Sequence, residues 1–137
     1  MKKGKAENLV VLSAIRGIKV PRFVVLCLGM SEDKQSEVIR GFLKSHDGGT
    51  VAVRSSADHE DSTGASFAGM YATKLWVKAT EQAIQVATQE VRHSGTKKKE
   101  VVAHYAEQRG LGLSESGVSV IVQKMIEADM SGVIFSH

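Results

Sequence analysis

The sequence contains few of the residues that cross-link or interrupt a small fold. Its 137 residues include 1 Cys and 1 Pro, and aromatic residues make up 5% of the chain. A single cysteine excludes a disulfide-stabilised scaffold and favours a reducing compartment. We expect this residue, Cys27, to be a small buried thiol, because it lies inside the apolar run from Phe23 to Met30.

Long apolar runs are also missing. The run from Phe23 to Met30 is among the longest in the chain, whereas about 18 apolar residues are needed to span a bilayer. Near the N-terminus, Glu7, Asn8 and Arg16 interrupt the charge-then-apolar order of a secretory signal, and no small-residue cleavage site follows. The sequence therefore predicts a cytoplasmic protein with no membrane partner.

The chain has no large excess of positive or negative residues. Lys and Arg total 18 while Asp and Glu total 15, which gives a formal net charge of +3. Six of the cations lie in two short runs, and without them the balance is 12 minus 15, or −3. These are Lys2, Lys3, Lys5, Lys97, Lys98 and Lys99. Two local patches and few aromatic rings make a basic nucleic-acid-binding domain the least favoured of our hypotheses, and we expect no nucleic-acid partner.

What the sequence does contain is a pattern of amphipathic and extended segments, with 42% hydrophobic residues, enough for one core. Apolar residues at every third position predict a helix over residues 5–16. Ser31 is a favourable N-cap for a second helix that ends before Asp47, and further helices are expected around residues 83–91 and 97–109. Strands are expected over 23–28, 50–55 and 70–77, with a hairpin pairing 118–126 with 132–136. The fold class is therefore α+β, with antiparallel pairing near the C-terminus.

A polar segment over residues 56–66 follows the predicted strand 50–55. Arg54 is expected at the end of that strand, pointing away from the side of Val51 and Val53. A guanidinium beside hydroxyl groups and glycine amides suits a phosphate, because its planar fork of donors matches phosphate oxygens. From these residues alone, a solvated arginine before a surface loop is the favoured alternative.

Four ordered sequence blocks together resemble a known family. They look like the nucleotide-binding domain of pyruvate phosphate dikinase and phosphoenolpyruvate synthase, which rifampicin phosphotransferase shares. The blocks are Gly4-Lys5-Ala6-Glu7-Asn8-Leu9, then Ile18-Lys19-Val20-Pro21 before Phe23, then Val53-Arg54-Ser55-Ser56-Ala57 with Ala65-Ser66-Phe67-Ala68-Gly69, and Val122-Gln123-Lys124-Met125 with Ser131-Gly132-Val133-Ile134-Phe135.

This resemblance implies an ATP-grasp-like N-terminal lobe, a mixed or antiparallel sheet with packed helices, as a single partial domain over residues 1–137. Lys5 and Arg54 then correspond to the cations that hold the ATP phosphates. Ser66 and Gly69 lie in the stretch that resembles the loop covering those phosphates, and Gln123 and Met125 in the strand that lines the adenine pocket. The alternatives are an exposed helix-start lysine for Lys5 and a plain core strand for Gln123 and Met125.

The resemblance also implies what lies outside the chain. Magnesium would accompany ATP, but the acidic ligands of the family follow the matched blocks, as do the phosphohistidine-carrying domain and the substrate barrel. We expect no metal site within the chain, since the acidic residues near Asp58 are more often simply solvated. The isolated chain is expected to be inactive, as a fragment of a phosphotransferase that passes phosphate from ATP to a histidine. The alternative is a non-catalytic nucleotide-binding or regulatory module.

Overall fold

The computed structural model describes residues 4–56, 71–108 and 118–136, with the backbone alone over 95–108. It is an α+β fold, as predicted. The elements in chain order are α1 (Lys5–Ser13), β1 (Phe23–Leu26), α2 (Glu32–Lys44), β2 (Thr50–Ser56), β3 (Thr73–Lys78), α3 (Glu81–Gln108) and β4 (Ser119–Lys124).

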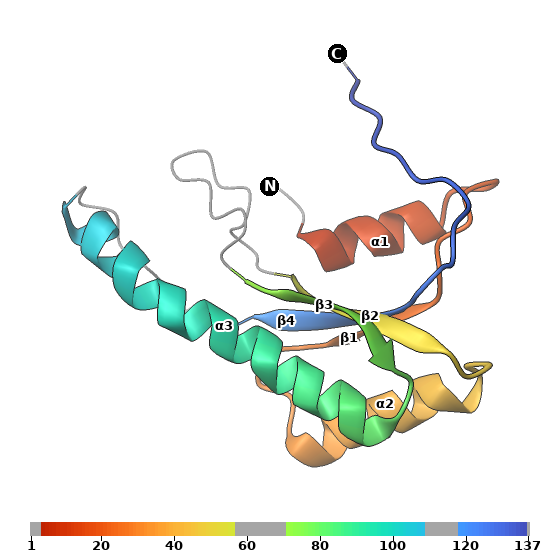
Figure 1. The fold of residues 1–137 in the computed structure, drawn as a ribbon, viewed down its shortest axis with the longest axis horizontal. Coiled ribbons are helices and arrows are strands. Elements are labelled where there is room, and N and C mark those ends of the chain that lie inside the picture. Colours follow the sequence, from red (N-terminus) through yellow and green to blue (C-terminus); the bar gives the residue numbers. More distant parts are fainter. Residues whose placement is uncertain (1–3, 57–70, 109–117, 137) are drawn as a thin grey trace.

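The four described strands form one antiparallel sheet in the order β1-β4-β2-β3. The last strand in the sequence therefore lies in the interior of the sheet, with Gln123 opposite both Phe23 on β1 and Ala52 on β2. Helices α2 and α3 cover one face of the sheet, and α1 lies over the other (Figure 1). The two faces consequently have different surroundings, one a closed core and the other more open.

The hydrophobic core fills the space between the sheet and helices α2 and α3. Because strand side chains alternate and helical ones recur every three to four residues, one face of each element supplies it. The predicted stripe on α2 is confirmed, with Ile39 and Phe42 buried and Val38 and Leu43 packed beside them. The buried cluster contains Leu26, Ile39, Phe42, Val51, Val53, Ile84, Ala87, Val91, Val120 and Val122.

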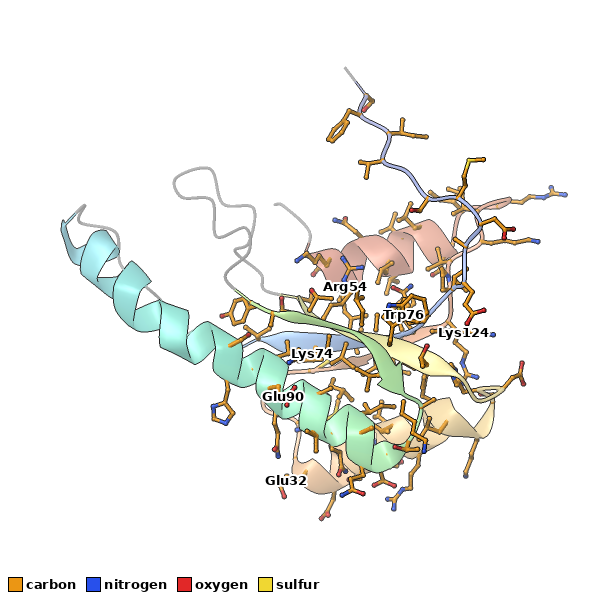
Figure 2. The ribbon with its side chains drawn as sticks, in the orientation of Figure 1. Glu32, Arg54, Lys74, Trp76, Glu90 and Lys124 are labelled. Atoms are coloured by element: carbon orange, nitrogen blue, oxygen red, sulfur yellow. The ribbon has the colours of Figure 1, made fainter. Side chains whose placement is uncertain are left out.

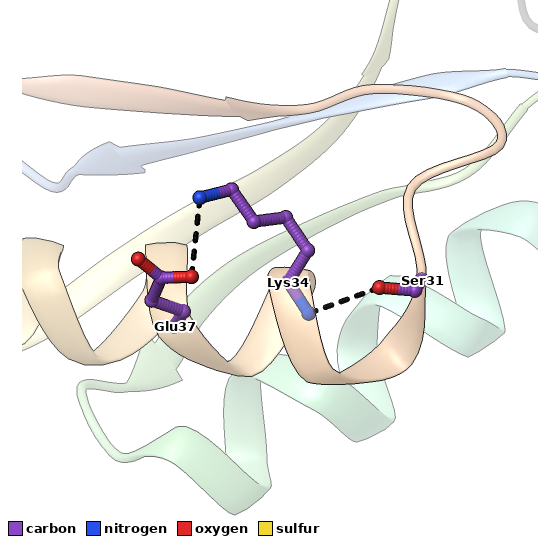
Figure 3. A network of polar contacts seen from close by, with 3 residues as sticks. All are labelled: Ser31, Lys34 and Glu37. Atoms are coloured by element: carbon purple, nitrogen blue, oxygen red, sulfur yellow. Dashed lines mark hydrogen bonds and ion pairs between the residues drawn. The ribbon is translucent and has the colours of Figure 1, made fainter.

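The predicted start of α2 is also confirmed. The Ser31 hydroxyl accepts a hydrogen bond from the Lys34 amide at 3.3 Å, and Lys34 Nζ lies 3.1 Å from Glu37 Oε2 (Figure 3). The cap satisfies an amide that has no partner within the helix, which typically contributes about 1 kcal/mol. The ion pair is exposed and adds less.

Two helix predictions need correction. The first helix ends at Ser13 rather than at residue 16, and the chain turns through Gly17, whose φ is +90°. The two helices expected around 83–91 and 97–109 are one helix, α3, of 28 residues. Gly95 lies between them without breaking the helix, because a single glycine lowers helix stability by only about 1 kcal/mol and does not remove a backbone donor.

The predicted C-terminal hairpin is wrong. Strand β4 ends at Lys124, and residues 132–136 form no strand, with Val133, Ile134 and Phe135 almost fully exposed. The reason lies in the sheet order, because both edges of β4 already pair with β1 and β2 and offer no free backbone groups. Local patterns of alternation do not reveal such competition from distant strands.

The prediction of a buried Cys27 is also wrong, since its side chain is exposed. Strand β1 ends at Leu26, two residues earlier than predicted, and Leu26 is fully buried. Cys27 begins the turn that follows, in which its carbonyl accepts from the Met30 amide at 3.3 Å. The apolar run therefore continues beyond the part of the strand that the helices cover.

Candidate functional site

Arg54 lies on β2 in the middle of the sheet. It is opposite Ile121 on β4 and Thr73 on β3, and its side chain is half-buried. Its neighbours Val53 and Val51 face the core, so Arg54 points to the other side, which we call the α1 face (Figure 2). The predicted orientation of Arg54 is therefore confirmed. A rigid strand presents its guanidinium on the open side of the sheet.

The first turn of α1 is attached close to Arg54. The Ala6 amide donates to Ser56 Oγ at 3.0 Å, and Ser56 follows Arg54 by two residues on β2, on the same face of the strand. The Glu7 carboxylate, at 3.3 Å, accepts from the Gly4 amide at the start of the same helix. These bonds place Lys5, which is exposed, beside the end of the strand that carries Arg54. Two positions predicted to hold phosphates thus come together.

This attachment is testable through Ser56. Amides in the first turn of a helix have no partner within the helix, so the Ala6 N–H depends on the Ser56 hydroxyl. In Ser56→Ala we expect the Ala6 amide to exchange with solvent much faster and the protein to lose about 1 kcal/mol of stability. Ser13→Ala, which removes an exposed bond to the Val10 carbonyl, is the matched control. Unchanged protection of Ala6 would show that the Ser56 contact is unimportant.

Gln123 and Met125 lie at the end of β4, on the side away from the Ser56 end of β2. Gln123 is 8% exposed, and its Nε2 donates to the Pro21 carbonyl at 3.0 Å. The Met125 amide donates to the Thr50 carbonyl at 3.0 Å, and the Lys124 amide to the Arg22 carbonyl at 2.9 Å. These hydrogen bonds connect the end of β4 to β2 and to the segment around Pro21, so all three donors stabilise the fold.

The remaining predicted positions, Ser66 and Gly69, lie outside the described residues, as do Asp58, Glu60 and Asp61. Within the described part of the chain, no group of three or more His, Cys, Asp or Glu side chains could hold a metal ion. The same part contains no helix that is both long and apolar enough to cross a membrane.

Among the described residues, Arg92 and the Lys74–Glu90 pair are charged groups that lie away from the α1 face. Arg92 on α3 donates to Gln35 Oε1 at 3.1 Å and to the Leu26 carbonyl at 3.5 Å, which links α3 to α2 and β1. Burial lowers the pKa of its guanidinium, though an arginine stays charged in proteins. Lys74 on β3 pairs with Glu90 on α3 at 2.9 Å (Figure 2). These groups hold the helices to the sheet and are not part of the candidate site.

Sequence reasoning missed Trp76. Strand β3 has a bulge between its pairs Val77 with Val51 and Lys74 with Val53, so that Leu75 and Trp76 together oppose Ala52. Trp76 has a φ of +57° and is 55% exposed. Figure 2 shows it on the α1 face, the side to which Arg54 points. Two consecutive large apolar residues, Leu75 and Trp76, interrupt the alternation of the strand, and this was the available signal.

Comparison with known proteins places this arrangement in context. The chain is 36% identical over 108 residues to an uncharacterized phosphotransferase, YvkC, of Bacillus subtilis, covering 78% of this chain and 13% of that protein. It is 33% identical over 112 residues to a probable phosphoenolpyruvate synthase of Methanocaldococcus jannaschii, and the match covers 78% of this chain and 9% of that protein. It is 42% identical over 88 residues to a phosphoenolpyruvate synthase of Aquifex aeolicus, and the match covers 63% of this chain and 10% of that protein. The chain thus spans about a tenth of the length of these relatives, and no solved structure matches it.

A model of a known protein family matches most of the chain. Residues 29–137 match the model described as the AMP/ATP-binding domain of pyruvate phosphate dikinase. Arg54, Gln123 and Met125 lie within the matched range, whereas Lys5 precedes it. The predicted resemblance is confirmed, and the chain belongs to the pyruvate phosphate dikinase AMP/ATP-binding domain family.

Proposed function

We propose that this chain is the ATP-binding lobe of a dikinase-type phosphotransferase, with an ATP-grasp-like arrangement of its sheet and helices. The observation that carries the proposal is the hydrogen bond between the Ala6 amide and Ser56 Oγ, which brings the first turn of α1 next to the strand of Arg54. Membership of an ATP-binding domain family supports the choice of ligand.

The proposed phosphate site is the Ser56 end of the α1 face. Arg54 supplies a planar fork of donors from a strand, and Lys5 supplies a compact point charge from the helix start. The positive end of the α1 dipole adds to both. Ser66 and Gly69 are proposed to cover the phosphates from the segment 57–70, as the family resemblance implies. Gln123 and Met125 are proposed to flank the adenine at the opposite end of the face.

The Met125 and Gln123 contacts limit how the base could be recognised. Because the Met125 amide and Gln123 Nε2 already donate within the chain, the groups proposed to face an adenine are the Met125 main-chain carbonyl oxygen, the Gln123 side-chain oxygen Oε1 and the apolar atoms of both residues. The exocyclic amino group of adenine is a donor, so an acceptor oxygen suits it. The plain core-strand alternative for these two residues is supported by the same bonds.

The reaction proposed for the complete protein is transfer of a phosphoryl group from ATP to a histidine on another domain. Lys5 and Arg54 would stabilise the negative charge on the phosphates as that group moves. Magnesium is proposed to accompany ATP, but the described residues offer no cluster of ligands for it, so we assign none of them to the metal. The phosphohistidine-carrying domain is the proposed partner.

A second candidate is a non-catalytic nucleotide-binding or regulatory module. The observation that favours it is the same lack of a metal-ligand cluster among the described residues, since phosphoryl transfer usually needs a cation across the phosphates. The two candidates share the ATP site and differ in whether bound ATP is consumed.

Calorimetric titration of the chain with ATP and AMP tests the shared site. We expect ATP to bind at least tenfold more tightly than AMP, because the β- and γ-phosphates would contact Arg54 and Lys5. The Arg54 contact alone would contribute the 1.5–3 kcal/mol that is roughly typical of a hydrogen bond to a charged group. Affinity for ATP should also fall as salt rises, because exposed charges are screened. Equal affinity for the two nucleotides, or no binding of ATP, would contradict the proposal.

A further inference from the structure

Trp76 adopts an unfavourable backbone conformation without the burial that usually accompanies one. Among the described residues it is the only one other than glycine with a positive φ, at +57°. For a bulky side chain this left-handed conformation costs about 1–2 kcal/mol. Trp76 is 55% exposed, so about half of this strained residue stays open to solvent. Strain of this kind concentrates at functional sites and is a reason to look for a ligand.

Trp76 lies on the α1 face, as strand alternation from the neighbouring residue Val77 requires. Val77 on one side of the bulge packs against the core, and Lys74 on the other side pairs with Glu90 on α3, so both flanking residues face the helices. Trp76 extends to the opposite side (Figure 2). Because of the bulge, Leu75 and Trp76 both lie opposite Ala52, where regular alternation would leave a single residue.

The register sets the neighbours of Trp76 on this face. Ala52 lies opposite the bulge on β2, and beyond it Gln123 lies on β4. Arg54 lies two residues farther along β2, about 7 Å along the strand and about 5 Å across from the line of Trp76. That separation is one that a ribose and an α-phosphate bridge between a base and the outer phosphates.

We propose that the Trp76 indole is a stacking platform for the purine base of ATP on the α1 face. This inference rests on the proposed function, since it uses Arg54 as the phosphate contact. An indole stacks well on a flat heteroaromatic ring, and more than half of the Trp76 surface is exposed to receive one.

Fluorescence provides a direct test, because Trp76 is the one tryptophan of the chain. We expect ATP to quench the emission of Trp76 as it binds. Inorganic triphosphate, which lacks a base, should compete with ATP for the site yet leave the emission of the free protein nearly unchanged. Quenching by triphosphate equal to that by ATP would show that the indole senses the phosphates or a general rearrangement, and would overturn the platform.

Two substitutions separate a ligand role from a structural one. Trp76→Asn removes the ring but accepts the left-handed conformation, so the melting temperature should equal or exceed that of the parent while ATP affinity falls about tenfold. Trp76→Phe retains an aromatic ring and should lose less than about threefold in affinity. Leu75→Ala, which truncates the equally exposed neighbour in the same bulge, is the matched control and should bind ATP normally.

The outcomes distinguish the two proposals. If the parent binds neither ATP nor inorganic triphosphate, the proposed function fails and the platform fails with it. If the parent binds ATP and Trp76→Asn binds it equally well, the platform is wrong while the proposed function stands. If Trp76→Asn is less stable than the parent, with unchanged ATP affinity, Trp76 is a structural residue.

Discussion

Replacing Arg54 with alanine is expected to weaken ATP binding by about 10- to 150-fold. This range corresponds to the 1.5–3 kcal/mol that a hydrogen bond to a charged group typically contributes. Arg54 is half-buried and comes from an interior strand, so little conformational freedom is lost when it meets a phosphate. Arg54→Lys should recover part of the loss, because the charge remains while the planar fork is absent.

The corresponding loss in Lys5→Ala is expected to be smaller, about two- to fivefold. Lys5 is exposed, and charge pairs of exposed lysines are worth about 0.2–1 kcal/mol. Calorimetric titration with ATP measures both variants, and Arg40→Ala is the control for net charge, since Arg40 is exposed on α2 across the sheet from the site. If Arg54→Ala and Arg40→Ala bind ATP equally, Arg54 does not contact the phosphates.

Truncating Phe42 to alanine is expected to destabilise the fold by about 3–5 kcal/mol. Phe42 is 1% exposed at the centre of the core, with the guanidinium carbon of Arg22 5.3 Å from its ring centroid and the His46 ring centroid at 5.2 Å. Its removal leaves a cavity and also takes away the surface on which these two side chains pack. Because domains of this size are stable by about 5–15 kcal/mol, such a loss is a large share of the total.

Urea unfolding followed by circular dichroism measures this loss. Phe42→Leu, which should cost less because most of the volume remains, keeps the effect measurable if Phe42→Ala does not fold. Val86→Ala on the outer side of α3 is the surface control and should change stability by less than about 0.5 kcal/mol. A Phe42→Ala protein as stable as the Val86→Ala protein would show that the core does not depend on this ring.

Local sequence patterns predicted the elements that local physics determines. Ser31 marked the start of α2 correctly, since a cap depends on residues only a few positions apart, and the stripe of Ile39 and Phe42 faced the core as expected. The α+β class followed from the same patterns, whereas the antiparallel sheet was one of the two arrangements that the family resemblance implied. Errors arose where one segment competes with another distant in sequence, as for the hairpin that β4 cannot join because β1 and β2 already flank it.

The candidate site also combines a feature that local patterns predict with features that they do not. That Arg54 would point away from Val51 and Val53 follows from the two-residue repeat of a strand. That α1 would lie against the end of β2 does not, because the bond between Ala6 and Ser56 joins residues 50 positions apart. Trp76 was missed because strand alternation assigns a residue to a face but reveals neither the bulge nor the positive φ at this position.

The position of β4 has a consequence for how the chain folds. Its partners are Phe23–Leu26 and Thr50–Ser56, so the contact between Phe23 and Gln123 closes a loop of about one hundred residues. Until β4 is inserted, β1 has no neighbour in the sheet, and β2 pairs with β3 as a two-stranded ribbon. Such ribbons are marginal in water. On a ribosome, therefore, the sheet cannot form until residue 124 has emerged from the exit tunnel, and folding should be slow compared with that of helical domains of similar size.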